Sequence, residues 1–287
     1  MIKVTLSNEI LKYITEIDKN RYKASEVSLP IAVASKLRKI SKKKSSYAST
    51  KIEGNPLSEK QVDEVIDSDE RKHYLKPEQE VRNYFLALNY LEEKAAKKER
   101  FSKKLILDVQ KYVEKGASKE KIGLRGPMPP GVLFAVYDSQ TGNPDYIPLE
   151  YIDISDLLDE LVEYVNETDD HPLIIAAVVH YQLVTIHPFE DGNGRTARLL
   201  SGYILDINGY GFNGIGSLEE YFAYVLMNTM NQSRWGCLHC IIRDERILRI
   251  LRFGSIISFT WCCYTQIRFA NCRRVQTTKN WKEAFHI

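Results

Sequence analysis

The sequence predicts a mainly α-helical protein, a helical bundle with a single β-hairpin. Apolar residues recur at three- and four-residue intervals through most long segments, which is the spacing of one helix face. Only residues 132–148 combine apolar and β-branched residues with a central turn cluster, Thr-Gly-Asn-Pro. A chain of 287 residues with 44% hydrophobic residues is long enough to bury a sizeable core.

Capping residues and prolines mark the expected helix starts in the first half of the chain. Ser, Asn and Asp side chains accept the unpaired N–H groups of a first turn, and proline fits its first position. The first helix is expected to reach about Lys19, and the last to span residues 103–114. In chain order, the residues that open these helices are Asn8, Pro30, Ser58, Pro77 and Ser102.

The β-hairpin is expected directly after a proline-rich stretch. Gly126–Gly131 cannot be helical, because its prolines lack the N–H group that a helix needs. Val132–Tyr137 then has the composition of a strand, Asp138–Asp145 that of a turn, and Tyr146–Pro148 that of a returning strand. A lone hairpin leaves at least one strand edge unpaired.

Two helices are expected before the most polar segment of the chain. Either Asp153 or Ser155 caps the first of them. Pro172 starts the second, and its residues Leu173–Ile186 are apolar on every face, so this helix is expected to be buried. His180 lies inside it and is expected to be a core histidine and not a ligand.

The composition changes near residue 225. All five cysteines lie after residue 236, and residues 225–287 carry ten Lys and Arg against three Asp and Glu, compared with 30 against 35 before them. We therefore divide the chain into an N-terminal helical region, 1–100, a core, 101–224, and an atypical tail, 225–287. The tail is expected to be weakly ordered beyond about Asn228.

Charge and hydropathy favour a cytoplasmic protein. A net charge of +2 gives no indication of nucleic-acid binding. No segment has the pattern of a secretory leader, and the longest apolar runs fall short of a membrane span. Neither a nucleic acid nor a membrane is expected as a partner.

One twelve-residue segment concentrates charged residues and glycines between two apolar helices. Pro188 keeps His187 out of helical geometry, so the preceding helix must stop there. Gly192 and Gly194 permit a turn with left-handed dihedrals before a new helix starts. The N–H groups of a helix N-terminus attract anions, phosphates above all. The segment reads His187-Pro188-Phe189-Glu190-Asp191-Gly192-Asn193-Gly194-Arg195-Thr196-Ala197-Arg198.

Four side chains of this segment can carry chemistry. His187 is the only group in it that can take up a proton near neutral pH. Asp191 offers a hard oxygen ligand of the kind that suits Mg²⁺. Arg195 and Arg198 lie three residues apart on one helical face and add charge-assisted donors for an anion.

Residues 187–198 resemble the active-site signature of the Fic family (filamentation induced by cAMP), His-x-Phe-x-(Asp/Glu)-Gly-Asn-Gly-Arg-x-x-Arg, and match every fixed position. The resemblance covers roughly Leu29 to Tyr224. It implies a Fic-type helical bundle and a protein adenylyltransferase: a hydroxyl of a target protein attacks the α-phosphate of ATP, and pyrophosphate leaves. ATP is then the substrate, Mg²⁺ the cofactor and a target protein the partner, and a homodimer is possible.

The same resemblance assigns roles within the segment. His187 deprotonates the attacking hydroxyl, Asp191 holds Mg²⁺, and Phe189 points inward and anchors the loop. Arg195 and Arg198 hold the β- and γ-phosphates. Backbone N–H groups form the anion site, assisted by the Asn193 side chain. The implied ATP- and phosphate-binding set is Asp191, Gly192, Asn193, Gly194, Arg195, Thr196, Ala197 and Arg198.

A second motif lies at the end of the second helix. Gly54 can end that helix in a left-handed conformation, which places Glu53 at the C-terminus, where the helix dipole disfavours negative charge. Glu53 therefore needs a cationic partner. Ser-x-x-x-Glu-Gly resembles the inhibitory motif of Fic proteins, which implies that Ser49, Glu53 and Gly54 are inhibitory and that Glu53 pairs with Arg198.

The hairpin occupies the position of the Fic flap, which holds a target segment by strand addition. The tyrosine pair that packs on adenine in family members is missing between residues 225 and 243. Two alternatives stay open: a regulatory binding protein with weakened ATP affinity, and a hydrolase that removes AMP with Glu53 positioning water. Transfer of another phosphate-containing group is also open. The implied flap residues are Val132, Leu133, Phe134, Ala135 and Val136.

Overall fold

The computed structural model describes residues 2, 4, 6, 8–26, 28–69, 71, 73–118, 122–132, 134–137, 144–211, 214–220 and 222–223. Leu133, Tyr224 and the tail 225–287 lie outside the described residues, so the expected weak order of the tail stays a prediction. No helix in the described part is both long enough and apolar enough to cross a bilayer. The elements are α1 (Asn8–Ser25), α2 (Ile31–Ile52), α3 (Glu59–Asp67), α4 (Lys76–Ala96), α5 (Lys103–Glu114), β1 (Val136–Tyr137), β2 (Pro144–Tyr146), η2 (Tyr151–Asp153), α6 (Ile154–Glu167), α7 (Pro172–Ile186) and α8 (Asn193–Ile207).

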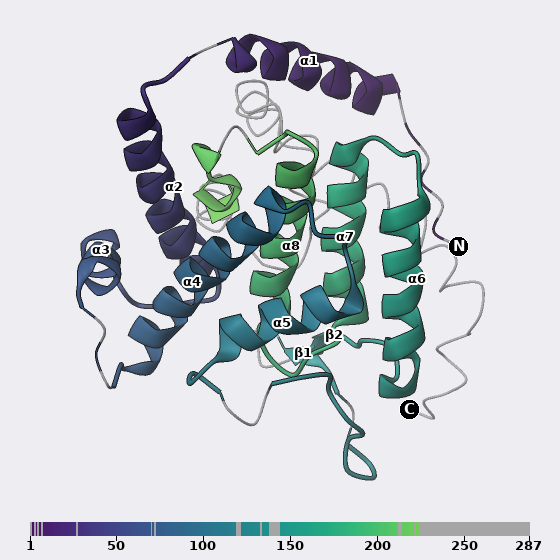
Figure 1. Ribbon diagram of the computed structural model, residues 1–287. Coiled ribbons are helices and arrows are strands. Elements are labelled where there is room, and N and C mark those ends of the chain that lie inside the picture. The colour runs from purple at the N-terminus through teal and green to yellow at the C-terminus, as the bar shows by residue number, and fades with distance from the viewer. Residues whose placement is uncertain are drawn as a thin grey trace.

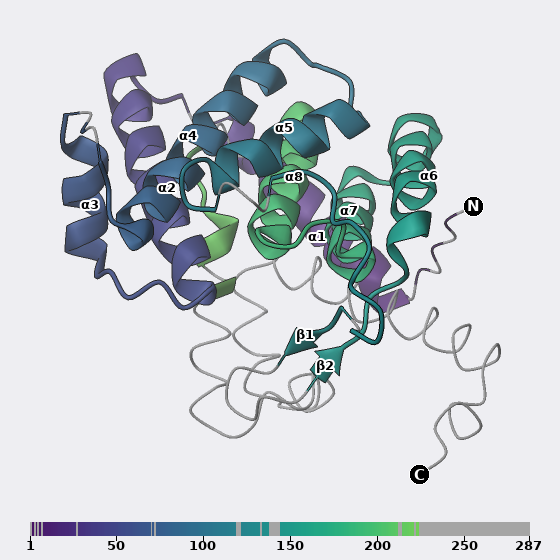
Figure 2. The same ribbon diagram turned by 90° about the horizontal axis from the view of Figure 1, so that it is seen from below.

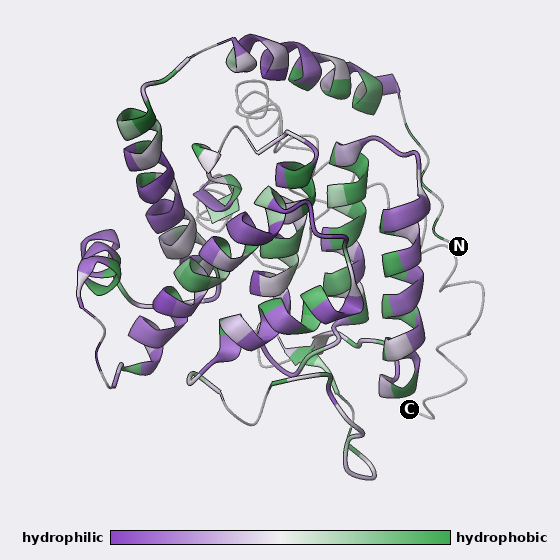
Figure 3. Ribbon diagram, in the orientation of Figure 1, coloured by the Kyte–Doolittle hydropathy of each residue, from purple (hydrophilic) through white to green (hydrophobic). Residues whose placement is uncertain are grey.

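Helix α7 lies in the interior of the bundle, between α8 and α6, with α1 above its end (Figure 1). Its residues Leu173–Val179 are buried without interruption. Apolar side chains on every face make this burial favourable, and Figure 3 shows the hydrophobic colour along most of the helix. The prediction of a mainly α-helical bundle with a buried central helix is confirmed.

The helices α2, α3 and α4 form a second group beside this core. α2 packs against α3 and α4, and a small cluster of buried valines, Val62, Val65 and Val81, joins α3 to α4. The C-terminal end of α2 also contacts α8. This brings the end of α2, predicted to carry an inhibitory motif, beside the helix that follows the polar loop.

Most of the predicted helix starts agree with the structure. Ser58 forms a capping box at the start of α3, and the Ser102 side chain accepts an N–H bond at the start of α5. The prediction for α6 is wrong: the side chains of Asp153 and Ser155 do not cap it. The 3₁₀ turn η2 leads directly into α6, so Asp153 precedes it without a side-chain bond and Ser155 lies inside it.

The predicted hairpin is present, but its strands are short. Strands β1 and β2 pair antiparallel, with Val136 opposite Tyr146. An isolated two-stranded ribbon is marginal by itself, so its attachment to the bundle matters. The Tyr146 hydroxyl donates to the Thr185 carbonyl at 2.7 Å, and the Arg125 N–H donates to the Pro188 carbonyl at 2.9 Å. Figure 2 shows the hairpin beside the bundle, close to α7.

Asn83 fixes the last turn of α5. Its buried amide donates to the carbonyls of Val113 at 2.9 Å and Lys115 at 2.8 Å, groups that a helix end leaves without internal donors. Asn83→Ala should lower the free energy of unfolding, measured by chemical denaturation, by about 1–3 kcal/mol, because both carbonyls lose their donor. Asn208→Ala, which removes an exposed amide at the end of α8, should change it by less than about 0.5 kcal/mol. Equal effects would contradict this role of Asn83.

Candidate active site

His187 ends α7 in a left-handed conformation, with φ 50° and ψ 58°. Pro188 forbids a helical continuation, as the sequence predicts. The Arg125 side chain donates to the His187 carbonyl at 2.8 Å and holds this unusual backbone in place. On the imidazole, Nδ1 lies 3.3 Å from the Val184 carbonyl, which favours a proton on Nδ1 and leaves Nε2 to accept one.

Hydrogen bonds within the loop after His187 fix its conformation. Phe189 is buried, as the resemblance implies, and its N–H and carbonyl both bond the side-chain amide of Asn193, at 3.0 and 2.8 Å. This amide was expected to assist in binding an anion. In the structure its two polar groups bond the backbone of Phe189 and stabilise the turn instead.

The two glycines of the segment differ in conformation and in what lies beside them. Gly192 has φ +80°, the left-handed conformation that the sequence predicts. Gly194 does not: it lies in the first turn of α8 with helical geometry. A Cβ atom on Gly194 would lie 2.6 Å from Oε1 of Glu53, so a side chain there would displace the end of the Glu53 side chain.

Arg198 is buried and paired with the end of α2. Its Nη2 lies 2.7 Å from Oε1 of Glu53 and 3.1 Å from the Ser49 carbonyl, and its Nε donates to the Ser49 hydroxyl at 2.8 Å. Burial lowers the pKa of Arg198, but Glu53, Tyr84 and Glu219 together raise it above its ordinary value, so the guanidinium stays charged. Gly54 has φ +86°. The predicted pairing of Glu53 with Arg198 is therefore confirmed as geometry.

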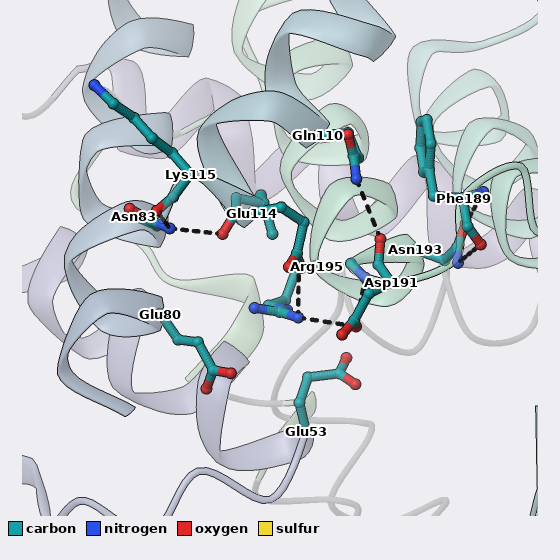
Figure 4. A network of polar contacts seen from close by, with 12 residues as sticks. Glu53, Glu80, Asn83, Gln110, Glu114, Lys115, Phe189, Asp191, Asn193 and Arg195 are labelled. Atoms are coloured by element: carbon teal, nitrogen blue, oxygen red, sulfur yellow. Dashed lines mark hydrogen bonds and ion pairs between the residues drawn. The ribbon is translucent and has the colours of Figure 1, made fainter. Parts of the chain in front are cut away.

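Arg195 lies one turn before Arg198 and contacts two carboxylates (Figure 4). Its Nη2 is 2.9 Å from Oε1 of Glu114 and 3.2 Å from Oδ1 of Asp191. The same Asp191 oxygen accepts the N–H of Gly192 at 2.8 Å. The other two nitrogens of Arg195, Nε and Nη1, are buried and have no hydrogen-bond partner among the described residues. A buried guanidinium with unsatisfied donors is suited to bind an anion.

Glu114 is a site residue that the sequence analysis missed. It is the last residue of α5, and its carboxylate is buried against Arg195. Burial raises the pKa of Glu114 to about 7, an effect that Arg195 opposes and Asp191 adds to. The available signal was a carboxylate closing a helix with an otherwise apolar inner face, but its partner lies 81 residues later and no local pattern connects them.

Other predicted residues are distributed unevenly around this centre. The Phe134 ring lies 5.9 Å from the His187 ring, which brings the flap to the catalytic candidate, whereas Val132 is half exposed. The side chains of Thr196 and Ala197 are fully buried in α8, and the Thr196 N–H bonds the Gly192 carbonyl. These two residues support the helix, and their side chains are not exposed to a ligand.

His180 behaves as the core histidine that the sequence predicts. Burial lowers its pKa to about 3, and the charge of Arg198 acts in the same direction. Its ring stacks on Phe222 with a centroid distance of 6.0 Å. A neutral imidazole inside α7 has no part in proton transfer at the loop.

The fold and the site define a class: a helical domain in which a histidine at the end of one helix lies one short loop before the N-terminus of the next. Residues 100–205 match the family model described as the Fic/DOC family. This protein therefore carries a Fic-family domain.

Curated relatives are similar over part of their length. The chain is 35% identical to a protein adenylyltransferase Fic of Nematostella vectensis over 104 residues, which is 34% of this chain and 23% of the relative. It is 30% identical to the protein of that name from Drosophila mojavensis over 171 residues, 57% of this chain and 32% of the relative. The chain thus spans about a third or less of the length of these proteins.

Solved structures agree on the fold. A Fic family protein from Desulfovibrio desulfuricans superposes with a TM-score of 0.63 at 22% identity, covering 95% of this chain and 76% of the other. Fic-1 (residues 134–508) from Caenorhabditis elegans gives a TM-score of 0.64 at 20% identity, covering 92% and 73%. At these identities the likeness establishes the fold.

The imidazole of His187 should titrate below pH 6.5. Burial lowers its pKa, and the nearby charge of Arg125 lowers it further. A neutral buried histidine stabilises the fold above pH 6.5, and this contribution is lost as the pH falls, because the unfolded chain takes up the proton first. NMR titration of ring protons, assigned by their loss in His187→Ala, measures the value. A pKa at or above 6.5 would contradict the burial argument.

Proposed function

We propose that this protein transfers AMP from ATP to a hydroxyl side chain of a target protein. The observation that carries the proposal is the joining of His187, through a loop of five residues, to a helix N-terminus that holds two buried arginines. A proton acceptor beside an anion site is the arrangement that phosphoryl-group transfer to a hydroxyl requires. The name of the similar relatives, protein adenylyltransferase, supports the same reaction.

The chemistry follows from these groups. Nε2 of His187 takes the proton of the target hydroxyl while its oxygen forms a bond to the α-phosphorus of ATP. The bond from that phosphorus to the bridging oxygen breaks, and pyrophosphate leaves with the electron pair. Arg195 and Arg198 neutralise the β- and γ-phosphates, and the N–H groups at the start of α8 stabilise the charge that develops. Removing one such donor typically slows a reaction about 10²–10³-fold.

Mg²⁺ fits this site through Asp191. The described residues contain no cluster of three or more His, Cys, Asp or Glu side chains that could hold a metal. Mg²⁺ bound with nucleotides needs no such cluster, because one or two carboxylates, phosphate oxygens and water complete its coordination. The Asp191 side chain is 34% exposed at the start of α8, where phosphates would lie. When bound, the ion would neutralise phosphate charge.

The flap is proposed to hold the target. Strand β1 pairs with β2 on one edge, and among the described residues no further strand pairs with its other edge. Strand addition there would bring a target hydroxyl toward His187, because Phe134 contacts that ring.

Glu53 is proposed to restrain the reaction. While Glu53 occupies Arg198, this arginine cannot hold the γ-phosphate, and ATP binds in a pose unsuited to attack. Glu53 stands at a helix end and its side chain is 40% exposed, so the pair can open without unfolding the core.

His187→Ala should lower AMP transfer at least about 10²-fold, because the general base is lost. The assay follows label from ATP marked at the α-phosphate into protein of a cell lysate, in the Glu53→Gly background. His73→Ala, an exposed histidine between α3 and α4, is the matched control and should keep the rate. Transfer retained in a folded His187→Ala protein would exclude this mechanism. The hydrolase alternative would be favoured if the protein with Glu53 intact released AMP from pre-labelled protein and the Glu53→Gly variant did not.

Glu53→Gly should raise transfer by roughly 5–150-fold, the range for a coupling of about 1–3 kcal/mol. Part of the gain is expected as self-modification. Tyr137 is 60% exposed on β1 and is a suitable acceptor, whereas Ser46 in α2 is fully buried and cannot act as one. Adding Arg198→Ala should abolish the gain. An unchanged rate with intact ATP binding would mean that Glu53 does not restrain the enzyme.

A further inference from the structure

Glu114 is a buried carboxylate that the proposed mechanism leaves without a role. It is 1% exposed, and its carboxylate forms an ion pair with Arg195, at 2.9 Å. It also closes α5, and a helix C-terminus disfavours negative charge. A carboxylate in such a place is expensive to bury unless it is well paired, so its presence calls for an explanation.

The surroundings of Glu114 hold its carboxylate in one place. The amide of Asn83 bonds the carbonyls on both sides of it, those of Val113 and Lys115. Gly192 provides the space above it, because a Cβ atom there would lie 2.6 Å from Oε1 of Glu114. Figure 4 shows the side chain pointing from α5 toward Arg195. Oε1 of Glu114 has no hydrogen-bond partner among the described residues, so the contact with Arg195 is an ion pair, in which a rigidly held carboxylate on one helix attracts a guanidinium on another.

Arg195 is paired at one nitrogen and lacks hydrogen-bond partners at the two others among the described residues. Both carboxylate contacts, to Glu114 and to Asp191, use Nη2. The buried Nε and Nη1 have no hydrogen-bond partner among the described residues. A guanidinium with two nitrogens that lack acceptors can bind the oxygens of an anion such as a phosphate.

We propose that Glu114 is a positioning residue, which holds Nη2 of Arg195 so that Nε and Nη1 stay directed to the phosphate chain of the nucleotide. The inference rests on the proposed function. Asp191 shares Nη2 but is 34% exposed and lies on the loop itself, whereas Glu114 belongs to the packed end of α5. Of the two anchors, Glu114 is the one that does not depend on the conformation of the loop.

The test measures dissociation constants of ATP, ADP and AMP by calorimetry for the Glu53→Gly protein and its variants. Glu114→Gln keeps the size of the side chain and removes its charge. It should weaken ATP and ADP binding about tenfold and AMP binding less than twofold, because Arg195 acts on phosphates that AMP lacks. Asp108→Asn removes a carboxylate from the outer face of the same helix and should leave all three constants unchanged.

A double-mutant cycle separates positioning from a structural role. In an Arg195→Ala background, adding Glu114→Gln should not weaken ATP binding further, since the residue acts only through Arg195. Glu114→Asp, which keeps the charge and shortens the reach, should also weaken ATP and ADP, and it serves if Glu114→Gln does not fold.

Three results would overturn the inference: unchanged ATP binding in a folded variant, equal weakening of all three nucleotides, or additive loss with Arg195→Ala. A Glu53→Gly parent that binds no ATP would instead remove the proposed function, and the inference with it.

Discussion

Two arginine side chains buried one helical turn apart constrain much of this structure. A guanidinium inside a protein needs a carboxylate, and here each carboxylate comes from the C-terminal end of a different helix. Arg195 meets Glu114 at the end of α5, and Arg198 meets Glu53 at the end of α2. The positions of α2 and α5 relative to α8 therefore follow from charge compensation as well as from apolar packing. Gly192 and Gly194 have no Cβ atom, and this leaves room for the carboxylates of Glu114 and Glu53 respectively.

The two pairs differ in how firmly they are held. Glu114 is 1% exposed and its helix end is fixed by Asn83, whereas the Glu53 side chain is 40% exposed at a helix terminus. Water can solvate the exposed carboxylate of Glu53 when it leaves Arg198, so that ion pair opens at a modest cost. The carboxylate of Glu114 has no such access to water, so its ion pair with Arg195 is held more firmly. The same chemistry thus forms a fixed ion pair in one place and, in the other, the ion pair that is proposed to act as a removable restraint.

Local sequence signals predicted most of the fold and the candidate site residues of segment 187–198. Capping residues and helical spacing located the helices, Pro188 predicted the backbone break at His187, and the pairing of Glu53 with Arg198 followed from the family resemblance. Contacts between distant segments were not predictable. Glu114 became a site residue only because α5 and α8 pack together, and the amide of Asn193 proved to be occupied by its own loop.

Gly194 lies where the proposed restraint, Glu53, meets the proposed anion site at the start of α8. Gly194 lies in the first turn of α8, and its lack of a Cβ atom leaves room for the Glu53 carboxylate. If the proposed restraint holds, a mutation at residue 53 would release it without changing α8. A side chain at residue 194 would displace Glu53 and also crowd Arg198, so it would affect both the proposed restraint and the proposed anion site. Residue 53 is then the position from which this chain could gain constant activity with the smallest structural change.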